Sequence, residues 1–115
     1  MGRVVDGYKQ FIELANKNDE AKGLMAGWDR IVQFIVQGGE DFYITIAGGK
    51  ASLTVGVHKS PNVTLKGPEE VMYKMLTREL DATRAYFAKQ YTIEGSMSDA
   101  MKFGRIGTAV AKTQK

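Results

Sequence analysis

At 115 residues the chain has the length of one domain with one hydrophobic core, and we expect residues 1–115 to form a single domain. Hydrophobic residues make up 43% of the chain and charged residues 25%, as in ordinary globular proteins, and no apolar run approaches the ~20 residues of a membrane-spanning helix. There is no cysteine, which excludes disulfides and thiol nucleophiles. Residues 1–10 show no signal-peptide pattern, so we expect a cytoplasmic protein.

The net charge of +3 is unevenly distributed along the chain. Residues 1–57 contain six Lys or Arg and seven Asp or Glu, whereas residues 58–115 contain ten and six. After Ala100 there are four basic residues, ending with Lys115, and no acidic one. Such a segment favours contact with an anionic surface, although a solvated helical end is the simpler interpretation.

The first half of the chain predicts one helix followed by four strands. Apolar residues recur at helical spacing from Val4 to Ala15, and this pattern fades near Gly23. Residues 30–37, 41–57 and 62–66 then alternate apolar and polar side chains, as strands do. Two Gly-Gly pairs, at residues 38–39 and 48–49, suit tight hairpin turns, so we expect a four-strand meander.

The second half predicts helices around a fifth strand. Pro68 suits the first position of a helix, and Glu69 and Glu70 suit its first turn, where negative charge complements the helix dipole. Asp81 is expected to cap a short helix over residues 82–90, residues 91–95 return to a strand, and "SMSD" at residues 96–99 fits a capping box before a last helix. These elements predict an α+β domain in which helices cover one face of a five-stranded, mainly antiparallel sheet.

The residues offer little for catalysis, metal binding or nucleic-acid binding. The one histidine, His58, lies beside a predicted turn with no nucleophile pattern around it, and the adjacent carboxylate pairs fall at helix ends or beside a turn. Neither dinucleotide nor phosphate-loop glycine patterns occur, so we predict no enzyme, no metal and no cofactor. The strand aromatics lie on apolar faces, with only Tyr43 on the open face, which argues against stacking on nucleic acid.

Methionine is concentrated on the predicted helices that should cover the sheet. Met72, Met75, Met97 and Met101 all lie there. Methionine fills irregular gaps in cores, and it also recurs on adaptable apolar binding surfaces. Composition leaves both interpretations open.

The C-terminal half resembles the sterol carrier protein type 2 family, and the order and length of the earlier elements agree with it over nearly the whole chain. The resemblance is carried by an ordered series of short matches without insertions: Asn62 to Leu65, Glu69-Glu70, Leu80-Asp81, Ala85-Tyr86-Phe87, Ile93 to Gly95 and Ala100 to Phe103. Three positions depart from the pattern: Arg78 stands where the family often has glycine, Ala82 where it often has proline, and Ser96 where it often has aspartate.

The resemblance implies a non-catalytic lipid carrier, in which the sheet and helices surround an apolar cavity for a fatty acid, fatty acyl-CoA or sterol-like lipid. On this interpretation we expect the cavity to be lined by apolar residues of both layers: Phe34, Ile44, Ile46, Leu53, Val55, Met72, Met75, Leu76, Phe87, Met97, Met101, Phe103 and Ile106. Lys102 and Arg105 are expected to meet a head group or an anionic membrane.

Two further functions stay open at this stage. The same fold with a filled core would serve as an accessory module that supports a partner enzyme without a lipid. An isomerase or hydrolase that uses the apolar pocket is a third hypothesis, although few titratable groups fall on inward-facing positions. The oligomeric state, a homodimer included, is also left open.

Overall fold

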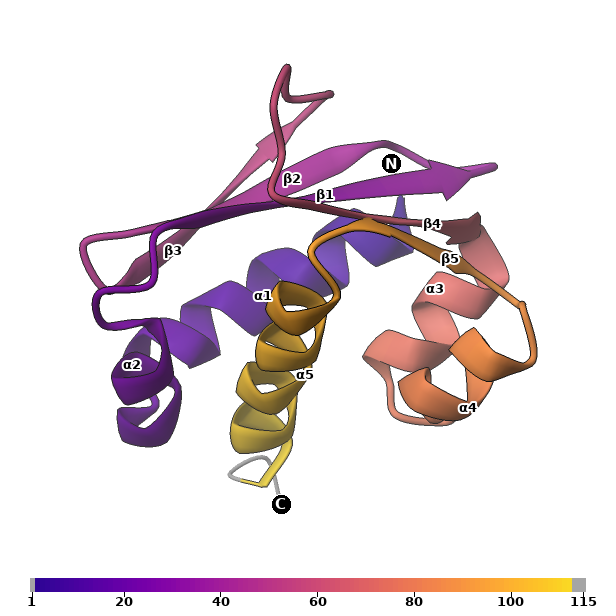
Figure 1. Ribbon diagram of the computed structural model, residues 1–115. Coiled ribbons are helices and arrows are strands. Elements are labelled where there is room, and N and C mark those ends of the chain that lie inside the picture. Colours follow the sequence, from indigo (N-terminus) through magenta and orange to yellow (C-terminus); the bar gives the residue numbers. More distant parts are fainter. Residues whose placement is uncertain (1, 113–115) are drawn as a thin grey trace.

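The computed structural model describes residues 2–112, so Lys115 of the basic C-terminal segment lies outside the described residues. One sheet forms the upper layer and the helices gather beneath it (Figure 1). The elements follow one another as α1 (Arg3–Lys17), α2 (Asp19–Met25), β1 (Arg30–Gln37), β2 (Phe42–Ala47), β3 (Lys50–Val55), β4 (Val63–Pro68), α3 (Glu69–Leu76), α4 (Ala82–Phe87), β5 (Thr92–Gly95) and α5 (Met97–Lys112). None of these helices combines the length and apolar character needed to cross a bilayer.

The sheet is mainly antiparallel, as predicted, but its strand order is β3-β2-β1-β4-β5. The predicted four-strand meander is therefore wrong, because β4 pairs with β1 in parallel, from Val32 opposite Val63 to Gln37 opposite Pro68. After β3 the chain crosses the outer face of the sheet to reach the far side of β1 (Figure 1). The two hairpins, β1–β2 and β2–β3, are antiparallel as the Gly-Gly pairs indicated.

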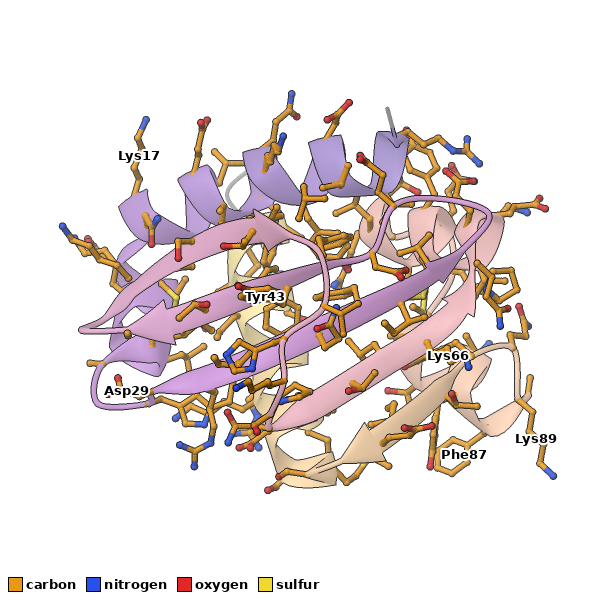
Figure 2. All side chains as sticks on the ribbon, turned by 90° about the horizontal axis from the view of Figure 1, so that it is seen from above. Lys17, Asp29, Tyr43, Lys66, Phe87 and Lys89 are labelled. Atoms are coloured by element: carbon orange, nitrogen blue, oxygen red, sulfur yellow. The ribbon has the colours of Figure 1, made fainter. Side chains whose placement is uncertain are left out.

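The buried side chain of Gln33 holds this crossing in place. It is 1% exposed, on the outer face of the sheet. Its amide group donates hydrogen bonds to the carbonyl oxygens of Phe42 and Gly56, at 2.9 and 3.1 Å, and its oxygen accepts one from the backbone N–H of His58 at 2.7 Å. The His58 ring then packs edge-on against Tyr43, which Figure 2 shows on the open face.

The N-terminal helical pattern covers two helices instead of one. Asn18 has extended backbone angles, and its side-chain oxygen accepts a hydrogen bond from the backbone N–H of Ala21 at 2.8 Å. This is an N-cap, which ends α1 and starts α2. Asn16, two residues earlier, pairs with both backbone groups of Ala51 and so covers the edge of β3.

The later helix starts agree with the sequence to within a residue. Asp81 caps α4 by accepting from the backbone N–H of Thr83 at 2.9 Å. Pro68 is the N-cap of α3 instead of its first residue, and Glu69 occupies the first turn. The capping box at Ser96 is only half formed, because Ser96 accepts from the backbone N–H of Asp99 while the Asp99 carboxylate binds elsewhere.

The hydrophobic core lies between the sheet and the helices. Its largest fully buried side chains come from β1, β2 and the helices that cover them: Phe34, Phe42, Ile44, Ile46, Met25, Met72 and Ile106. The outer face carries polar side chains such as Lys66 (Figure 2). The helices thus cover one face of the sheet, as the sequence predicted.

Candidate ligand-binding cavity

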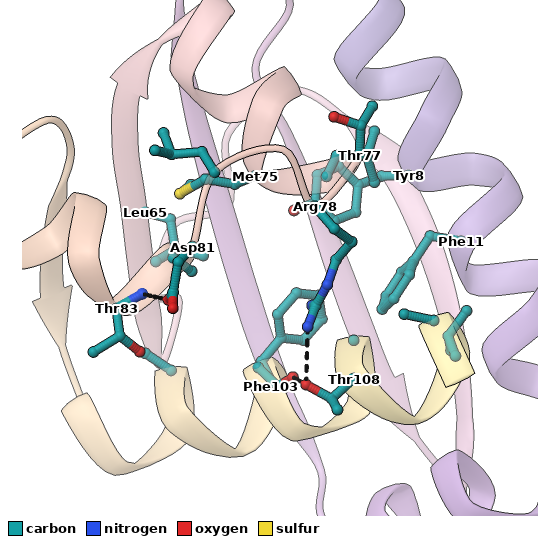
Figure 3. Close-up of a pocket in the computed structure, with 18 of the residues that line it drawn as sticks. Tyr8, Phe11, Leu65, Met75, Thr77, Arg78, Asp81, Thr83, Phe103 and Thr108 are labelled. Carbon is teal, nitrogen blue, oxygen red and sulfur yellow. Dashed lines mark hydrogen bonds between the residues drawn. The ribbon is translucent and has the colours of Figure 1, made fainter. Parts of the chain in front are cut away.

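A cavity of about 1720 Å³ opens on the helix side of the sheet. It lies between α5 on one side and the α3–α4 segment on the other, with α1 and the strands β4 and β5 behind it (Figure 3). Small-molecule sites usually occupy ~300–1,000 Å³, so this cavity has room for a long alkyl chain or a ring system.

Aromatic side chains form one wall of the cavity. Tyr8, Phe11 and Phe103 line it, and Figure 3 shows them on the side of α1 and α5. The Phe11 and Phe103 rings are 5.7 Å apart, and Tyr8 packs on Phe34 at 4.7 Å between ring centroids. Phe34 is fully buried behind this wall and stacks on Phe42, so the aromatic wall continues directly into the core.

Two tyrosines place hydroxyl groups in this otherwise apolar region. The Tyr91 hydroxyl donates a hydrogen bond to the carbonyl oxygen of Ala82 at 2.9 Å, and burial raises the pKa of Tyr91. Burial raises the pKa of Tyr8 still further, because the phenolate would have to form in the protein interior. Both residues therefore act as neutral hydrogen-bonding groups at neutral pH.

Charged residues surround the mouth of the cavity. Arg3 is paired with Glu69, its Nε 2.8 Å from a carboxylate oxygen, and this hydrogen bond lowers the pKa of Glu69. Arg78 extends from the loop after α3 and donates from Nη2 to the Thr108 hydroxyl on α5 at 3.3 Å (Figure 3). Arg84 and Arg105 also line the mouth and are exposed.

The helical residues that the sequence analysis assigned to a lipid site divide into two groups. Six residues of the predicted set line the cavity: Met75, Leu76, Phe87, Met97, Met101 and Phe103. Met72 and Ile106 are each 1% exposed and belong to the core. Of the two basic residues, Arg105 lines the cavity, whereas the Lys102 amino group lies 5.1 Å from the centre of the Trp28 ring.

The strand residues of the predicted set do not line this cavity. Phe34, Ile44 and Ile46 are fully enclosed in the core. Leu53 is partly buried against that core, and Val55, at the end of the edge strand β3, is 51% exposed. The strand order explains this placement, because β2 and β3 occupy the half of the sheet that lies above α1 and α2, whereas the cavity lies beneath β4 and β5.

Sequence reasoning missed several lining residues. Tyr8 and Phe11 were recognised as an apolar face of the first helix, but nothing in the sequence showed that this face continues into a cavity. Leu65 and Ile93 line it from β4 and β5, and they are register partners across those strands. Arg78 was noted only as a departure from glycine.

The titratable side chains of the described residues do not gather into a metal-binding cluster. Within residues 2–112, no group of three or more His, Asp or Glu side chains is placed to hold a metal ion. The His58 ring nitrogen Nδ1 accepts a hydrogen bond from the backbone N–H of Ser60 at 3.0 Å, and the ring packs against Tyr43 on the open face of the sheet, away from the cavity (Figure 2). The cavity is instead a large, mainly apolar space with polar and charged residues among its lining, a combination that suits ligands with an apolar body.

A helix-covered sheet with an open apolar cavity of this size defines a ligand-binding domain of the carrier type. The model of the SCP-2 sterol transfer family matches residues 8–107, and the chain belongs to this family. Lipid binding or transfer in general is thereby established for the domain, and domains of this family are typically non-catalytic.

Solved structures agree with this assignment over almost the full length of the chain. The sterol carrier protein domain 2 of Helicoverpa armigera is 25% identical, with a TM-score of 0.76, and the match covers 97% of this chain and 91% of that one. The ubiquinone synthesis protein UbiJ is 11% identical, with a TM-score of 0.72 and coverage of 97% and 94%, so the likeness to it is one of fold.

A third structure shows the fold as a small part of a larger protein. The inverting sec-alkylsulfatase Pisa1 from Pseudomonas sp. is 19% identical with a TM-score of 0.63, and the match covers 76% of this chain. The chain spans only 14% of the length of that enzyme, so the likeness concerns the fold of one region. No curated protein sequence gave a significant match.

Proposed function

We propose that this protein binds a fatty acid, a fatty acyl-CoA or a sterol-like lipid in the cavity beneath β4 and β5 and transfers it between sites without chemical change. The observation that carries this proposal is the cavity of about 1720 Å³, whose walls are mainly aromatic and aliphatic, with charged and polar residues among them. A chain without cysteine suits the reducing cytoplasm, where we place this activity.

The energetics suit a carrier. Burying a sixteen-carbon chain at ~0.8 kcal/mol per CH₂ gives a gross gain of ~13 kcal/mol. Part of this gain is lost when the ligand and the cavity side chains become ordered, so micromolar to nanomolar dissociation constants are expected. A carrier needs affinities in this range, because the lipid must be released again.

The mouth of the cavity suits delivery to an anionic membrane. Phe87 and Met101 are 75% and 61% exposed, and Met97 beside them is 39% exposed. All three line the cavity, and the exposed Arg84 and Arg105 lie on the same rim. Apolar side chains among basic ones are the pattern of a surface that inserts shallowly between anionic head groups.

The first experiment is native mass spectrometry of the purified protein, followed by organic extraction of any bound mass. We expect a lipid of alkyl or sterol type, and we expect added lipid to raise the melting temperature of the stripped protein. A bare mass that stays bare after incubation with fatty acids, acyl-CoA and sterols would contradict the proposal. The accessory module that supports a partner enzyme would then be the better hypothesis.

A pair of glycine substitutions locates the ligand. Gly104 lines the cavity on α5, and no atom lies within 4 Å of a Cβ placed there, so Gly104→Leu should fold and fill part of the space. Gly23 on α2 is equally unobstructed and lies outside the cavity lining, which makes Gly23→Leu the matched control. We expect Gly104→Leu to weaken lipid binding about tenfold and Gly23→Leu to leave it unchanged; equal effects would place the ligand elsewhere.

A further inference from the structure

Arg78 is the residue that spans the mouth of the cavity. Its side chain runs from the loop after α3 toward α5, where Nη2 donates to the Thr108 hydroxyl at 3.3 Å (Figure 3). Among the described residues this is the one hydrogen bond between residues 69–91 and α5. The guanidinium group lies against the helix at Gly107, where a Cβ would be 3.6 Å from Nη1, an ordinary van der Waals distance.

The backbone of Arg78 adopts a conformation that glycine would adopt more easily. Its φ of 70° lies in the left-handed region, which costs a residue with a Cβ roughly 1 kcal/mol or more. The loop ends α3 there, with the Arg78 N–H bonded to the carbonyl oxygen of Met75 at 3.2 Å. A strained, non-glycine residue whose side chain points into a cavity is a recognised mark of a functional position.

The guanidinium group of Arg78 has no acidic partner. No carboxylate of the described residues lies within 4.0 Å of it. The acidic residues nearest in sequence are Glu79 and Asp81, and the Asp81 carboxylate is already bound to the N-terminus of α4. A guanidinium group has five N–H donors, and the one side-chain hydrogen bond of Arg78 leaves most of them available.

The other arginines of the mouth are less suited to bind a head group. Arg3 is engaged by Glu69. Arg78, Arg84 and Arg105 are all exposed, but no hydrogen bond of the described residues fixes the side chains of Arg84 and Arg105. Arg78 is held in place at the cavity by Thr108, so less side-chain freedom is lost when it binds an anion.

Building on the proposed function, we infer that Arg78 binds the anionic head group of the lipid, and that the ligand is a single-chain amphiphile ending in a carboxylate or a phosphate. The head group accepts hydrogen bonds from the guanidinium group at the mouth, and the alkyl chain extends inward along Tyr8, Phe11 and Phe103. An alcohol or ester of equal chain length keeps the apolar contacts and lacks the charge-assisted hydrogen bonds.

A second donor lies close by. Within residues 2–112, every fully enclosed polar atom of a side chain has a hydrogen-bond partner. The Tyr8 hydroxyl has no such partner there, so it is not fully enclosed and opens onto the cavity that Tyr8 lines. The positive charge of Arg78 acts on Tyr8 and partly offsets the rise in its pKa that burial causes, which places the two groups in electrostatic range of each other. Tyr8 therefore stays protonated and can donate beside Arg78.

The test measures displacement of Nile red, an uncharged fluorophore, from the full chain by four ligands of equal chain length. These are hexadecanoate, hexadecyl phosphate, hexadecanoyl-CoA and hexadecanol. For the wild type we expect the carboxylate, the phosphate or both to bind about tenfold more tightly than the alcohol at low salt. Comparison of the three anions tells a free fatty acid from a phosphate-bearing lipid.

Three variants decide whether Arg78 is responsible. Arg78→Gln should remove the preference for anions, a loss of about tenfold, while its affinity for hexadecanol stays within twofold. Arg84→Gln and Arg105→Gln carry the same change of charge on the rim and should keep the preference. The inference is overturned if Arg78→Gln keeps the preference for anions or weakens the binding of all four ligands equally. It is also overturned if Arg105→Gln loses the preference for anions to the same extent.

A separate result would overturn the single-chain part of the proposed function and leave only a sterol-like ligand. If none of the four ligands displaces Nile red from the wild type or changes its melting temperature, the cavity does not bind single-chain lipids at all. If hexadecanol binds as tightly as the anions, the lipid-binding proposal stands and only the role of Arg78 is refuted.

Discussion

The indole Nε1 of Trp28 donates a hydrogen bond to Asp99 Oδ1 at 3.3 Å, although 71 residues separate the two in sequence. The other carboxylate oxygen accepts from Arg30 Nε at 3.0 Å, and the Asp99 side chain is only 11% exposed. Trp28 and Arg30 flank the start of β1, whereas Asp99 lies in the first turn of α5. This carboxylate therefore attaches the helix that forms one side of the cavity to the sheet.

We predict that Asp99→Ala lowers the free energy of unfolding by ~2–3 kcal/mol, because the buried indole N–H of Trp28 and the partly buried guanidinium group of Arg30 lose a charged acceptor. Asp99→Asn should cost less, since its amide oxygen can still accept from one of the two donors. Urea unfolding monitored by the fluorescence of Trp28, the one tryptophan of the chain, measures both. Glu13→Ala, at an exposed position of α1, is the control and should stay within ~0.5 kcal/mol of the wild type; an equal loss there would refute the attachment.

Two glycine-to-alanine substitutions should change stability in opposite directions. Gly95 ends β5 with φ at 93°, and a Cβ there would lie 2.6 Å from the carbonyl oxygen of Asn62, so Gly95→Ala should cost at least ~2 kcal/mol. Gly104 is exposed within α5 with open space around it, so Gly104→Ala should stabilise the protein by ~1 kcal/mol. Urea unfolding measures both, and changes of the same sign would contradict the described backbone at one of the two sites.

The raised pKa of Tyr8 predicts a specific loss of stability at alkaline pH. The unfolded chain ionises Tyr8 at its ordinary pKa of 10.0, whereas the folded protein keeps it protonated to higher pH. The stabilisation is therefore complete below pH ~10, and each pH unit above it removes up to ~1.4 kcal/mol until the pKa of the folded state is reached. Tyr8→Phe cannot ionise, so its melting temperature should fall less than that of the wild type between pH 9 and 11.5. Parallel curves for the two proteins would show that Tyr8 is not buried.

Local sequence signals predicted the elements well and their pairing poorly. Helical periodicity and strand alternation depend on neighbouring residues, and Asp81 could be recognised as a cap because its partner is two residues away. The parallel pairing of β4 with β1 depends on contacts over about thirty residues, which alternation does not encode. Gln33 was the sequence signal for this pairing, because this polar residue within an apolar strand binds the chain that crosses from β3 to β4.

The same long-range pairing decided which site residues could be predicted. Helical residues such as Met75 and Met101 could be chosen by their face alone, and the structure places them on the cavity. Ile44 and Ile46 also lie on the inner face, but closely packed helices cover their half of it. Only the strand order determines which half of the face is covered in this way. Arg78 is polar and lies in a loop, so no pattern of apolar residues could identify it.

The exposed apolar residues at the mouth should control the rate of lipid delivery. We predict that the double variant Phe87→Ser, Met101→Gln transfers a fluorescent fatty acid to anionic vesicles at least fivefold more slowly, because burying one phenylalanine in a membrane surface contributes ~1.5–3 kcal/mol. Both side chains are mostly exposed, at 75% and 61%, so the melting temperature should hardly change. A stopped-flow transfer assay with vesicles containing phosphatidylglycerol measures the rate, and equilibrium titration measures the affinity.

Val57→Ser is the matched control for this measurement. Val57 is 67% exposed, but it lies in the segment after β3 and is not part of the cavity lining. We expect this variant to transfer at the wild-type rate, and we expect higher salt to slow the wild type, because Arg84 and Arg105 are drawn to the anionic surface. If Val57→Ser slows transfer as much as the double variant, delivery does not proceed through the mouth, and another face of the domain must meet the membrane.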